Sequence, residues 1–214
     1  MSTPRPAARA AALGRPATDA GCAGCAHLVT LRALRRAGVE VQGGIGCEEG
    51  AGRAFVPAHG RWGAVTGVAR LLRTGGPALL AEAGRAGAGL VIVADRIAPV
   101  RSLRIEEELA RVGARHAWMD LDDAAAAEAL VREVLDAPGP VLVALARCVR
   151  GAPRAAPLAV DASLCNRCGS CLTLACPALS DGGEATVVDP DVCTGCGRCA
   201  PLCRSRALGP PRAV

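Results

Sequence analysis

The chain has 214 residues, which suits one medium-sized domain or two small ones, and no apolar run in it is long enough to span a bilayer. Hydrophobic residues make up 51% of it, but one Phe, two Trp and no Tyr supply neither an aromatic-rich β-sandwich core nor the stacking platforms of single-strand nucleic-acid binders. The formal net charge of +5 treats the cysteines as neutral, and ionised cysteines would lower it, so the charge does not argue for a nucleic-acid partner.

The first segment, residues 1–19, is rich in Arg, Ala and Pro without apolar periodicity, which predicts a disordered tail. It also lacks the apolar stretch of a secretory signal peptide. The 12 cysteines that follow are therefore expected to be metal-bound thiolates in a reducing compartment, the cytoplasm, and not the disulfides of a secreted scaffold.

Residues 20–148 alternate between helical and strand patterns. Apolar spacing and glycine or proline boundaries predict helices over 26–38, 61–76, 77–87, 105–113 and 122–139. Short runs rich in Val, Leu and Ile or aromatic residues predict strands over 39–42, 89–95, 116–120 and 140–146. This alternation predicts an α/β fold with an open, mainly parallel sheet and helices on both faces.

A second, smaller unit is expected at residues 159–208, after a linker at 149–158 and before a short tail at 209–214. The unit has little apolar content of its own. Domains below roughly 60 residues usually need additional stabilisation, which bound clusters would provide here.

Two cysteine runs dominate this smaller unit, CNRCGSCLTLACP from Cys165 and CTGCGRCAPLC from Cys193. In two-cluster ferredoxins the fourth cysteine of each run ligates the other run's cluster, whereas zinc usually takes cysteines in two pairs. The spacing therefore predicts two [4Fe-4S] clusters, and Gly169, Gly195 and Gly197 would let the backbone approach them. The predicted ligand sets are Cys165, Cys168, Cys171 and Cys203 for the first cluster, and Cys193, Cys196, Cys199 and Cys176 for the second.

The two runs depart from the ferredoxin spacing at their ends. Four residues, not three, separate Cys171 from Cys176, and Arg204 stands where a proline follows the last cysteine in the usual pattern. Neither departure removes a ligand, so the prediction of two clusters is unchanged.

The four remaining cysteines are Cys22, Cys25, Cys47 and Cys148. Loops at one edge of an open parallel sheet converge, so these thiolates could meet and hold a third [4Fe-4S] cluster. Zinc and free thiols remain alternatives for this set. His27 follows closely and could contact a cofactor phosphate or tune the cluster, or could be an ordinary polar residue of the first helical turn.

Six motifs occur in a fixed order along the chain, and together they resemble a known family. They are CAGCAH at 22–27, GGIGC at 43–47, WGAVTG at 62–67, ARC at 146–148 and the two ferredoxin-type runs. Over residues 20–208 the chain resembles the C-terminal part of the α subunit of indolepyruvate ferredoxin oxidoreductase, within the 2-oxoacid:ferredoxin oxidoreductases. The resemblance implies a domain of the thiamine-diphosphate type and supports the third cluster.

The resemblance also implies where thiamine diphosphate and magnesium would bind, namely at His27, Gly46, Gly63 and Asp95. The chain departs from the family pattern at this site. Gly44 replaces an Asp, Val65 replaces a Ser of the diphosphate loop, and a Gly-Asp turn between Gly76 and Pro77 is missing. Magnesium needs several oxygen ligands, so diphosphate affinity is expected to be poor.

Three functions follow as hypotheses. The first is an iron-sulfur electron-transfer protein or subunit with a redox partner, either a ferredoxin or an oxidoreductase subunit. The second is a thiamine-diphosphate-dependent catalytic subunit that assembles with partner subunits. The third is a cluster-containing scaffold or oxygen sensor without a redox cycle. We favour the first, because the diphosphate site departs most from the family pattern.

Overall fold

The computed structural model describes residues 22–38, 62–67, 89–94, 106–107, 109–111, 113, 115–135, 141–145, 149 and 153–211. The predicted tail at 1–19, strand at 39–42 and helix at 77–87 lie outside these residues. No helix in the described ranges combines the length and the apolar character needed to cross a membrane.

Four parallel strands form one sheet in the order β1-β2-β4-β3. They are β1 (Trp62–Gly67), β2 (Gly89–Ala94), β3 (His116–Met119) and β4 (Val141–Leu145). The two inner strands have the sequences GLVIVA and VLVAL, and such continuous apolar runs are typical of strands that are covered on both faces. Strands β2, β3 and β4 thus confirm the strands predicted in these stretches.

Strand β1 contradicts the helix predicted over 61–76, because Trp62–Gly67 pairs in parallel with β2. The segment WGAVTG contains two glycines, which destabilise a helix interior, and the β-branched Val65 and Thr66, which favour strands. The helical prediction came from apolar spacing over the whole range 61–76, and it is wrong for residues 62–67. Tertiary pairing with β2 determines its conformation.

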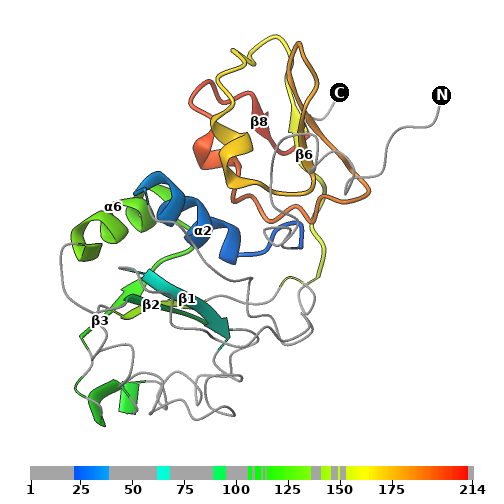
Figure 1. Cartoon of the computed structure of the whole chain (residues 1–214). Coiled ribbons are helices and arrows are strands. Elements are labelled where there is room, and N and C mark those ends of the chain that lie inside the picture. Colours follow the sequence, from blue (N-terminus) through cyan, green and yellow to red (C-terminus); the bar gives the residue numbers. More distant parts are fainter. Residues whose placement is uncertain are drawn as a thin grey trace.

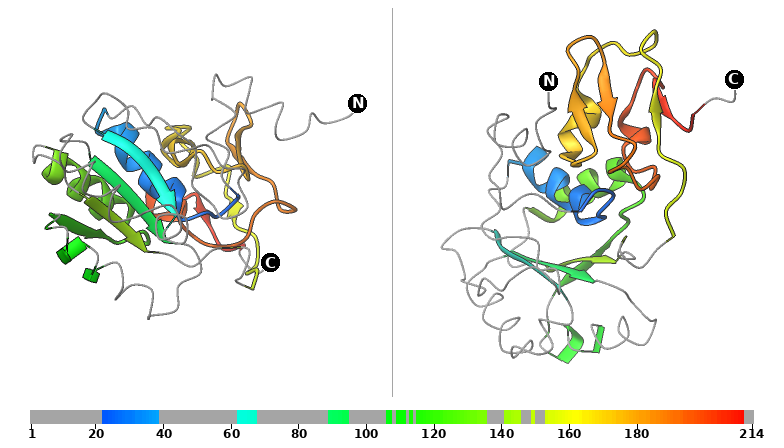
Figure 2. Two further views of the ribbon diagram at one scale, coloured as in Figure 1. Left: turned by 60° about the horizontal axis from the view of Figure 1, so that its bottom comes forward. Right: turned by 90° about the vertical axis from the view of Figure 1, so that its right-hand side faces the viewer.

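Two helices cover one face of the sheet, α2 (His27–Arg36) and α6 (Ala124–Leu135). A short helical stretch within residues 106–111 lies on the other side of the sheet (Figures 1 and 2). Helix α6 begins after Asp123, whose Oδ1 accepts hydrogen bonds of 2.9 Å from the backbone N–H groups of Ala125 and Ala126. An aspartate at this position satisfies amides that have no partner inside the helix.

The C-terminal unit, residues 153–211, lies over α2 and α6 on the side away from the sheet (Figures 1 and 2). Strand β5 (Ala159–Val160) pairs antiparallel with β8 (Leu208–Gly209), and β6 (Leu179–Asp181) pairs antiparallel with β7 (Thr186–Val188). Two short 3-10 turns complete the unit, η3 (Ser170–Leu174) and η4 (Ala200–Leu202).

Helix α2 lies between the sheet unit and the C-terminal unit, and all eight residues from His27 to Leu34 are buried. Its leucines belong to one hydrophobic core that includes Val131 of α6 and Leu142 of β4 and extends to Leu174 and Leu208 of the C-terminal unit. A helix that is buried all round is typical of the interior of a protein. The core is therefore continuous across the predicted linker, and the domain boundaries drawn from the sequence stay a prediction.

Candidate metal centre

The first cysteine run is held by turns with unusual backbone angles. Arg167 and Gly169 both have positive φ angles, 57° and 67°, and the 3-10 turn η3 begins directly after Gly169. The Asn166 side chain accepts a hydrogen bond from the backbone N–H of Cys168 at 3.3 Å. These turns hold three cysteines of the run, Cys165, Cys168 and Cys171, within a stretch of seven residues.

Thr186 of β7 links two of these cysteines. Its hydroxyl lies 3.4 Å from Cys171 Sγ, and hydrogen bonds from Thr186, the backbone one first, hold the pKa of Cys165 below its usual range. Hydrogen bonds from Ser170 similarly lower the pKa of Cys168, whose Sγ lies 3.4 Å from Ser170 Oγ. Donors that stabilise a thiolate also stabilise a thiolate bound to iron.

The structure brings Cys203 toward the first set through its neighbour. Arg204 follows Cys203 directly, and its charge contributes to the lowered pKa of Cys168. Cys203 Sγ itself lies 3.5 Å from Ser205 Oγ. This placement agrees with the predicted set of Cys165, Cys168, Cys171 and Cys203, which stays a prediction.

The charges that act on Cys176 come from the second run. Burial raises the pKa of Cys176, and the negative charges of Cys196 and Cys193 raise it further. Burial likewise raises the pKa of Cys199 to about 12, with Cys176 the next contributor and Cys196 and Cys193 after it. The four thiols thus influence one another's ionisation, and their assignment to one cluster stays a prediction.

The donor sets fit clusters on chemical grounds. Cys176 and Cys199 are each only 7% exposed, and buried thiols with raised pKa values stay protonated until a cation replaces the proton. Among the described residues no three His, Cys, Asp or Glu side chains converge as a single metal ion would require. A [4Fe-4S] cluster binds each thiolate through a different iron and therefore accommodates a wider set.

The Cys22–Cys25 loop lies against the second set. Gly24, between the two cysteines, has a φ angle of +72°, and a Cβ at this position would come within 3.1 Å of Cys196 Sγ and would clash with the Thr194 hydroxyl. The Gly24 backbone also donates a hydrogen bond that partly offsets the raised pKa of Cys176. Two C-x2-C segments that are far apart in the sequence thus lie so close together that a side chain at position 24 would not fit between them.

Arg198 stabilises this packing through hydrogen bonds. The residue belongs to the second cysteine run, and its Nη1 donates a hydrogen bond to the backbone carbonyl of Gly24 at 3.2 Å. Its Nη2 lies 3.2 Å from Asp122 Oδ1, just before α6. The Arg198 side chain is 14% exposed, and its buried Nε and the buried Thr194 Oγ1 have no hydrogen-bond partner among the described residues.

The other predicted site residues lie either outside the described residues or within a helix or strand. Cys47, Cys148, Gly46 and Asp95 lie outside the described residues. Gly63 lies within strand β1, and His27 is buried as the first residue of α2. The structure thus places two of the four cysteines predicted for a third cluster, and these two lie next to the second set.

Four residues of the site were not identified from the sequence, namely Gly24, Ser170, Thr186 and Arg198. Ser170 and Arg198 lie inside the cysteine runs, so their position between ligands was an available signal. Gly24 had a similar signal, because CAGC and CTGC share a glycine before the second cysteine. Thr186 lies 15 residues from Cys171, the ligand of its set that is nearest in sequence, and the β6–β7 hairpin brings it there.

Comparison with known families supports the reading of the C-terminal unit. Residues 158–204 match the family described as the 4Fe-4S dicluster domain. No curated protein matches the chain. No solved structure matches it either. The chain therefore carries a ferredoxin-type 4Fe-4S domain, and an iron-sulfur electron-transfer role follows from that domain.

Proposed function

We propose that this chain is an electron-transfer protein or subunit in which a third [4Fe-4S] cluster stands next to the two clusters of the ferredoxin-type domain. The observation that supports this most directly is the contact between Gly24 and Cys196. It brings Cys22 and Cys25 to the edge of the second cysteine set. Neighbouring clusters allow electrons to pass from one to the next, and the protein determines their spacing and potential.

The chain's own residues would bind and shield these groups. Cys22 and Cys25, together with Cys47 and Cys148, would hold the third cluster, and the two ferredoxin-type sets would hold the others. When bound, such clusters accept and release single electrons. The Gly24 amide is positioned to favour negative charge at the second set.

The burial of the cysteines differs between the two sets and indicates which set would exchange electrons with a partner protein. Two of the four cysteines in the second set, Cys176 and Cys199, are buried, but only Cys171 of the first set is. The first set is therefore the less buried of the two, although each set has one exposed cysteine, Cys168 and Cys196. We therefore propose that the first set exchanges electrons with a partner redox protein, and that the second set connects it to the third.

The proposal extends to the relationship with 2-oxoacid:ferredoxin oxidoreductases and to a cytoplasmic location. The order of the cysteine motifs supports the relationship, and the ligand sets, which are sensitive to oxygen, support a reducing compartment. Thiamine diphosphate is not included, because its predicted residues depart from the family pattern and Gly63 lies within a strand.

The test is an anaerobic redox titration monitored by electron paramagnetic resonance on the full chain. We expect reversible one-electron reductions at low potential, with magnetic interaction between the second and third clusters that disappears in the Cys22→Ser, Cys25→Ser double variant. Glu133→Gln, at an exposed position of helix α6 outside both cysteine runs, is the control. Clusters that do not cycle, or turnover of a 2-oxoacid dependent on thiamine diphosphate, would overturn the proposal.

A further inference from the structure

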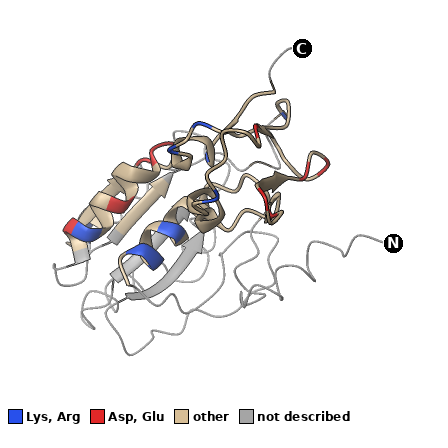
Figure 3. Ribbon diagram, turned by 90° about the horizontal axis from the view of Figure 1, so that it is seen from above, with Lys and Arg blue, Asp and Glu red and all other residues tan. Residues whose placement is uncertain are grey.

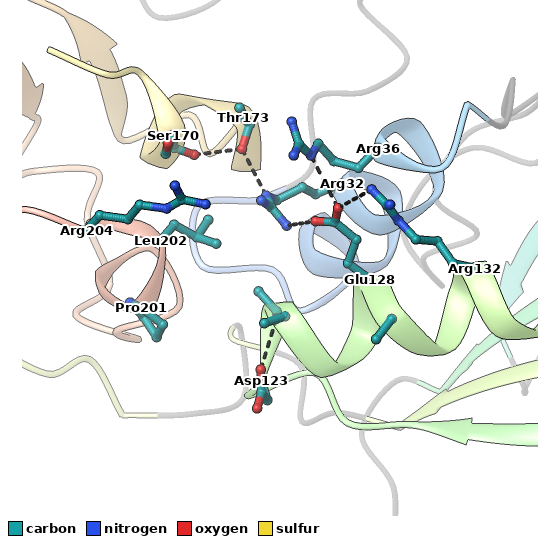
Figure 4. Close-up of a pocket in the computed structure, with 13 residues that line it drawn as sticks. Arg32, Arg36, Asp123, Glu128, Arg132, Ser170, Thr173, Pro201, Leu202 and Arg204 are labelled. Atoms are coloured by element: carbon teal, nitrogen blue, oxygen red, sulfur yellow. Dashed lines mark hydrogen bonds and ion pairs between the residues drawn. The ribbon is translucent and has the colours of Figure 1, made fainter.

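A depression of about 500 Å³ lies where α2 and α6 meet the C-terminal unit (Figure 4). Its charged lining consists of four arginines and two acids, Arg32, Arg36, Arg132, Arg204, Asp123 and Glu128. Cavities of this size accept small organic ligands. None of these residues is a predicted cluster ligand or a residue of the predicted thiamine site.

Positive charge exceeds negative charge in this depression. Three arginines share the single carboxylate of Glu128, Arg132 at 2.8 Å, Arg32 at 3.1 Å and Arg36 at 3.5 Å. Burial opposes ionisation of Glu128, but the three arginines together hold its pKa below its usual value, so the carboxylate is charged at neutral pH. One carboxylate therefore leaves two of these three guanidinium charges without compensation.

The remaining charged groups, Asp123 and Arg204, are equal in number and opposite in sign, so the excess of two positive charges remains. Asp123 accepts the two N-terminal amides of α6 and faces the helix start. Arg204 reaches into the depression from the C-terminal unit (Figure 4) and has no carboxylate partner among the described residues. Figure 3 shows basic positions on α2 next to both acidic and basic positions on α6.

Hydrogen bonds hold two of the residues that line the depression in fixed positions. The Arg32 side chain is only 10% exposed, and its Nε donates to Thr173 Oγ1 at 2.9 Å while its Nη1 is paired with Glu128. The Thr173 hydroxyl in turn donates to the Ser170 carbonyl at 2.6 Å. Hydrogen bonds thus fix Arg32 and Thr173, whereas Arg36 and Arg132, at 53% and 58% exposed, have room to contact a ligand.

We propose that this depression binds a small oxyanion, a phosphate ester or a di- or tricarboxylate, between Arg36, Arg132 and Arg204. Guanidinium groups bind both kinds of oxyanion through paired N–H donors. Arg204 acts as the residue from the C-terminal unit that closes the site. Binding of such a ligand requires no cluster.

The site is coupled to the first cysteine set, a step that rests on the proposed function. Ser170 lines the depression and contacts Cys168, and Arg204, which also lines it, directly follows Cys203. An anion beside Arg204 compensates its positive charge, so adding one electron from the titrant to the first cluster becomes less favourable. By linkage, the reduced protein binds the anion more weakly by the same factor.

The test uses the anaerobic full chain, with inorganic phosphate and succinate as separate probes in isothermal titration calorimetry at low ionic strength. We expect saturable binding of at least one probe, about tenfold weaker in Arg204→Gln and in Arg132→Gln, the magnitude of one lost charge-assisted contact. The matched control is Arg115→Gln, because Arg115 is exposed, precedes edge strand β3 and does not line the depression. Its affinity should equal that of the unmodified chain.

The two probes distinguish the ligand classes, since phosphate binding alone indicates a phosphate ester and succinate binding alone a carboxylate. Absence of binding by both, or equal losses in Arg115→Gln and Arg204→Gln, would overturn the site. Electron transfer to an acidic protein that depends on Arg204 without any binding of the probes would replace it with a protein-docking surface.

A redox titration in the presence of the bound probe distinguishes a failure of this inference from a failure of the proposed function. The bound probe should lower the midpoint potential of one cluster, and Arg204→Gln should remove that shift. Reversible clusters with bound anion but no shift would overturn the coupling and leave the proposed function intact. Anion binding to a chain that holds no reducible cluster would refute the proposed function and leave the site.

Discussion

At the scale of single residues, Arg198 has the most distinctive position in the molecule. It lies between Cys196 and Cys199, yet its hydrogen bonds go to Gly24 and Asp122 in the other unit. These two contacts differ in environment, because the Asp122 side chain is 85% exposed whereas Gly24 is buried. A hydrogen bond from a charged donor in a buried setting contributes about 1.5–3 kcal/mol, but an exposed ion pair contributes about 0–1 kcal/mol.

Replacing Arg198 by Met should therefore loosen the Cys22–Cys25 loop. We expect amide hydrogen exchange in residues 22–30 to accelerate roughly 10- to 100-fold, following from the lost hydrogen bond to Gly24. Asp122→Asn is the control and should change this exchange little. Equal acceleration in both variants would show that the ion pair with Asp122, and not the hydrogen bond to Gly24, stabilises the loop.

Protonation should separate the two ferredoxin-type sets. A raised thiol pKa means that the proton competes more strongly with iron, so binding at Cys176 and Cys199 is lost at a higher pH as the solution is acidified. The lowered pKa values of Cys165 and Cys168 delay that competition to a lower pH. Stepwise anaerobic acidification, followed by alkylation and mass spectrometry, should therefore label the second set first.

The same labelling experiment tests how the ligands are shared. Cys176 should become reactive together with Cys193, Cys196 and Cys199. If Cys176 is labelled together with Cys165, Cys168 and Cys171, the exchange of fourth ligands does not occur. If the first set is released at the higher pH, the pKa argument is wrong.

At the scale of elements, the decisive feature is the turn before α2. Gly24 and Gly38 flank the helix with similar positive φ angles, +72° and +77°, but only Gly24 has neighbours that a Cβ would meet. The pair therefore separates backbone strain from packing. Strain alone costs about 1–2 kcal/mol for a residue with a side chain in this region.

We expect Gly24→Ala to destabilise the anaerobic chain by more than Gly38→Ala does, as measured by denaturant unfolding. Gly38→Ala should lose about 1–2 kcal/mol, and Gly24→Ala more, because Thr194 and Cys196 have to move. Gly24→Ala should also alter the resonance signal of the second cluster. Equal losses with an unchanged signal would mean that the two C-x2-C loops do not touch.

Most elements in the described residues were predictable from local sequence. The strands at 89–95 and 140–146 appear as β2 and β4, and the helices at 26–38 and 122–139 appear as α2 and α6, since apolar runs and glycine, proline or aspartate boundaries act locally. Strand β1 was not predictable in this way, because its conformation depends on pairing with β2.

The candidate site likewise has a part that was predictable from local sequence and a part that was not. The cysteine spacing identified the ferredoxin-type domain, because the ligands of each run are close in sequence. The contact between Gly24 and Cys196 and the arginines around Glu128 join residues from distant segments. Such contacts depend on how α2 packs against the C-terminal unit, which no local pattern specifies.

At the scale of the whole molecule, one hydrophobic core unites the two units that the sequence separated. Leu28 and Leu34 of α2 are at most 1% exposed, and they share the core with Leu174 and Leu208 of the C-terminal unit. The same packing holds the Cys22–Cys25 loop at the second cysteine set and forms the arginine-lined depression. Burial of α2 therefore positions both proposed sites at once.

The most direct test of this account is the content of iron and acid-labile sulfide per chain after anaerobic purification, with the Cys22→Ser, Cys25→Ser double variant measured in parallel. Three clusters correspond to about 12 irons and 12 sulfides in the unmodified chain, and about 8 of each should remain in the variant. About 8 of each in both proteins would contradict the third cluster and leave a two-cluster ferredoxin-type domain joined to a domain without iron.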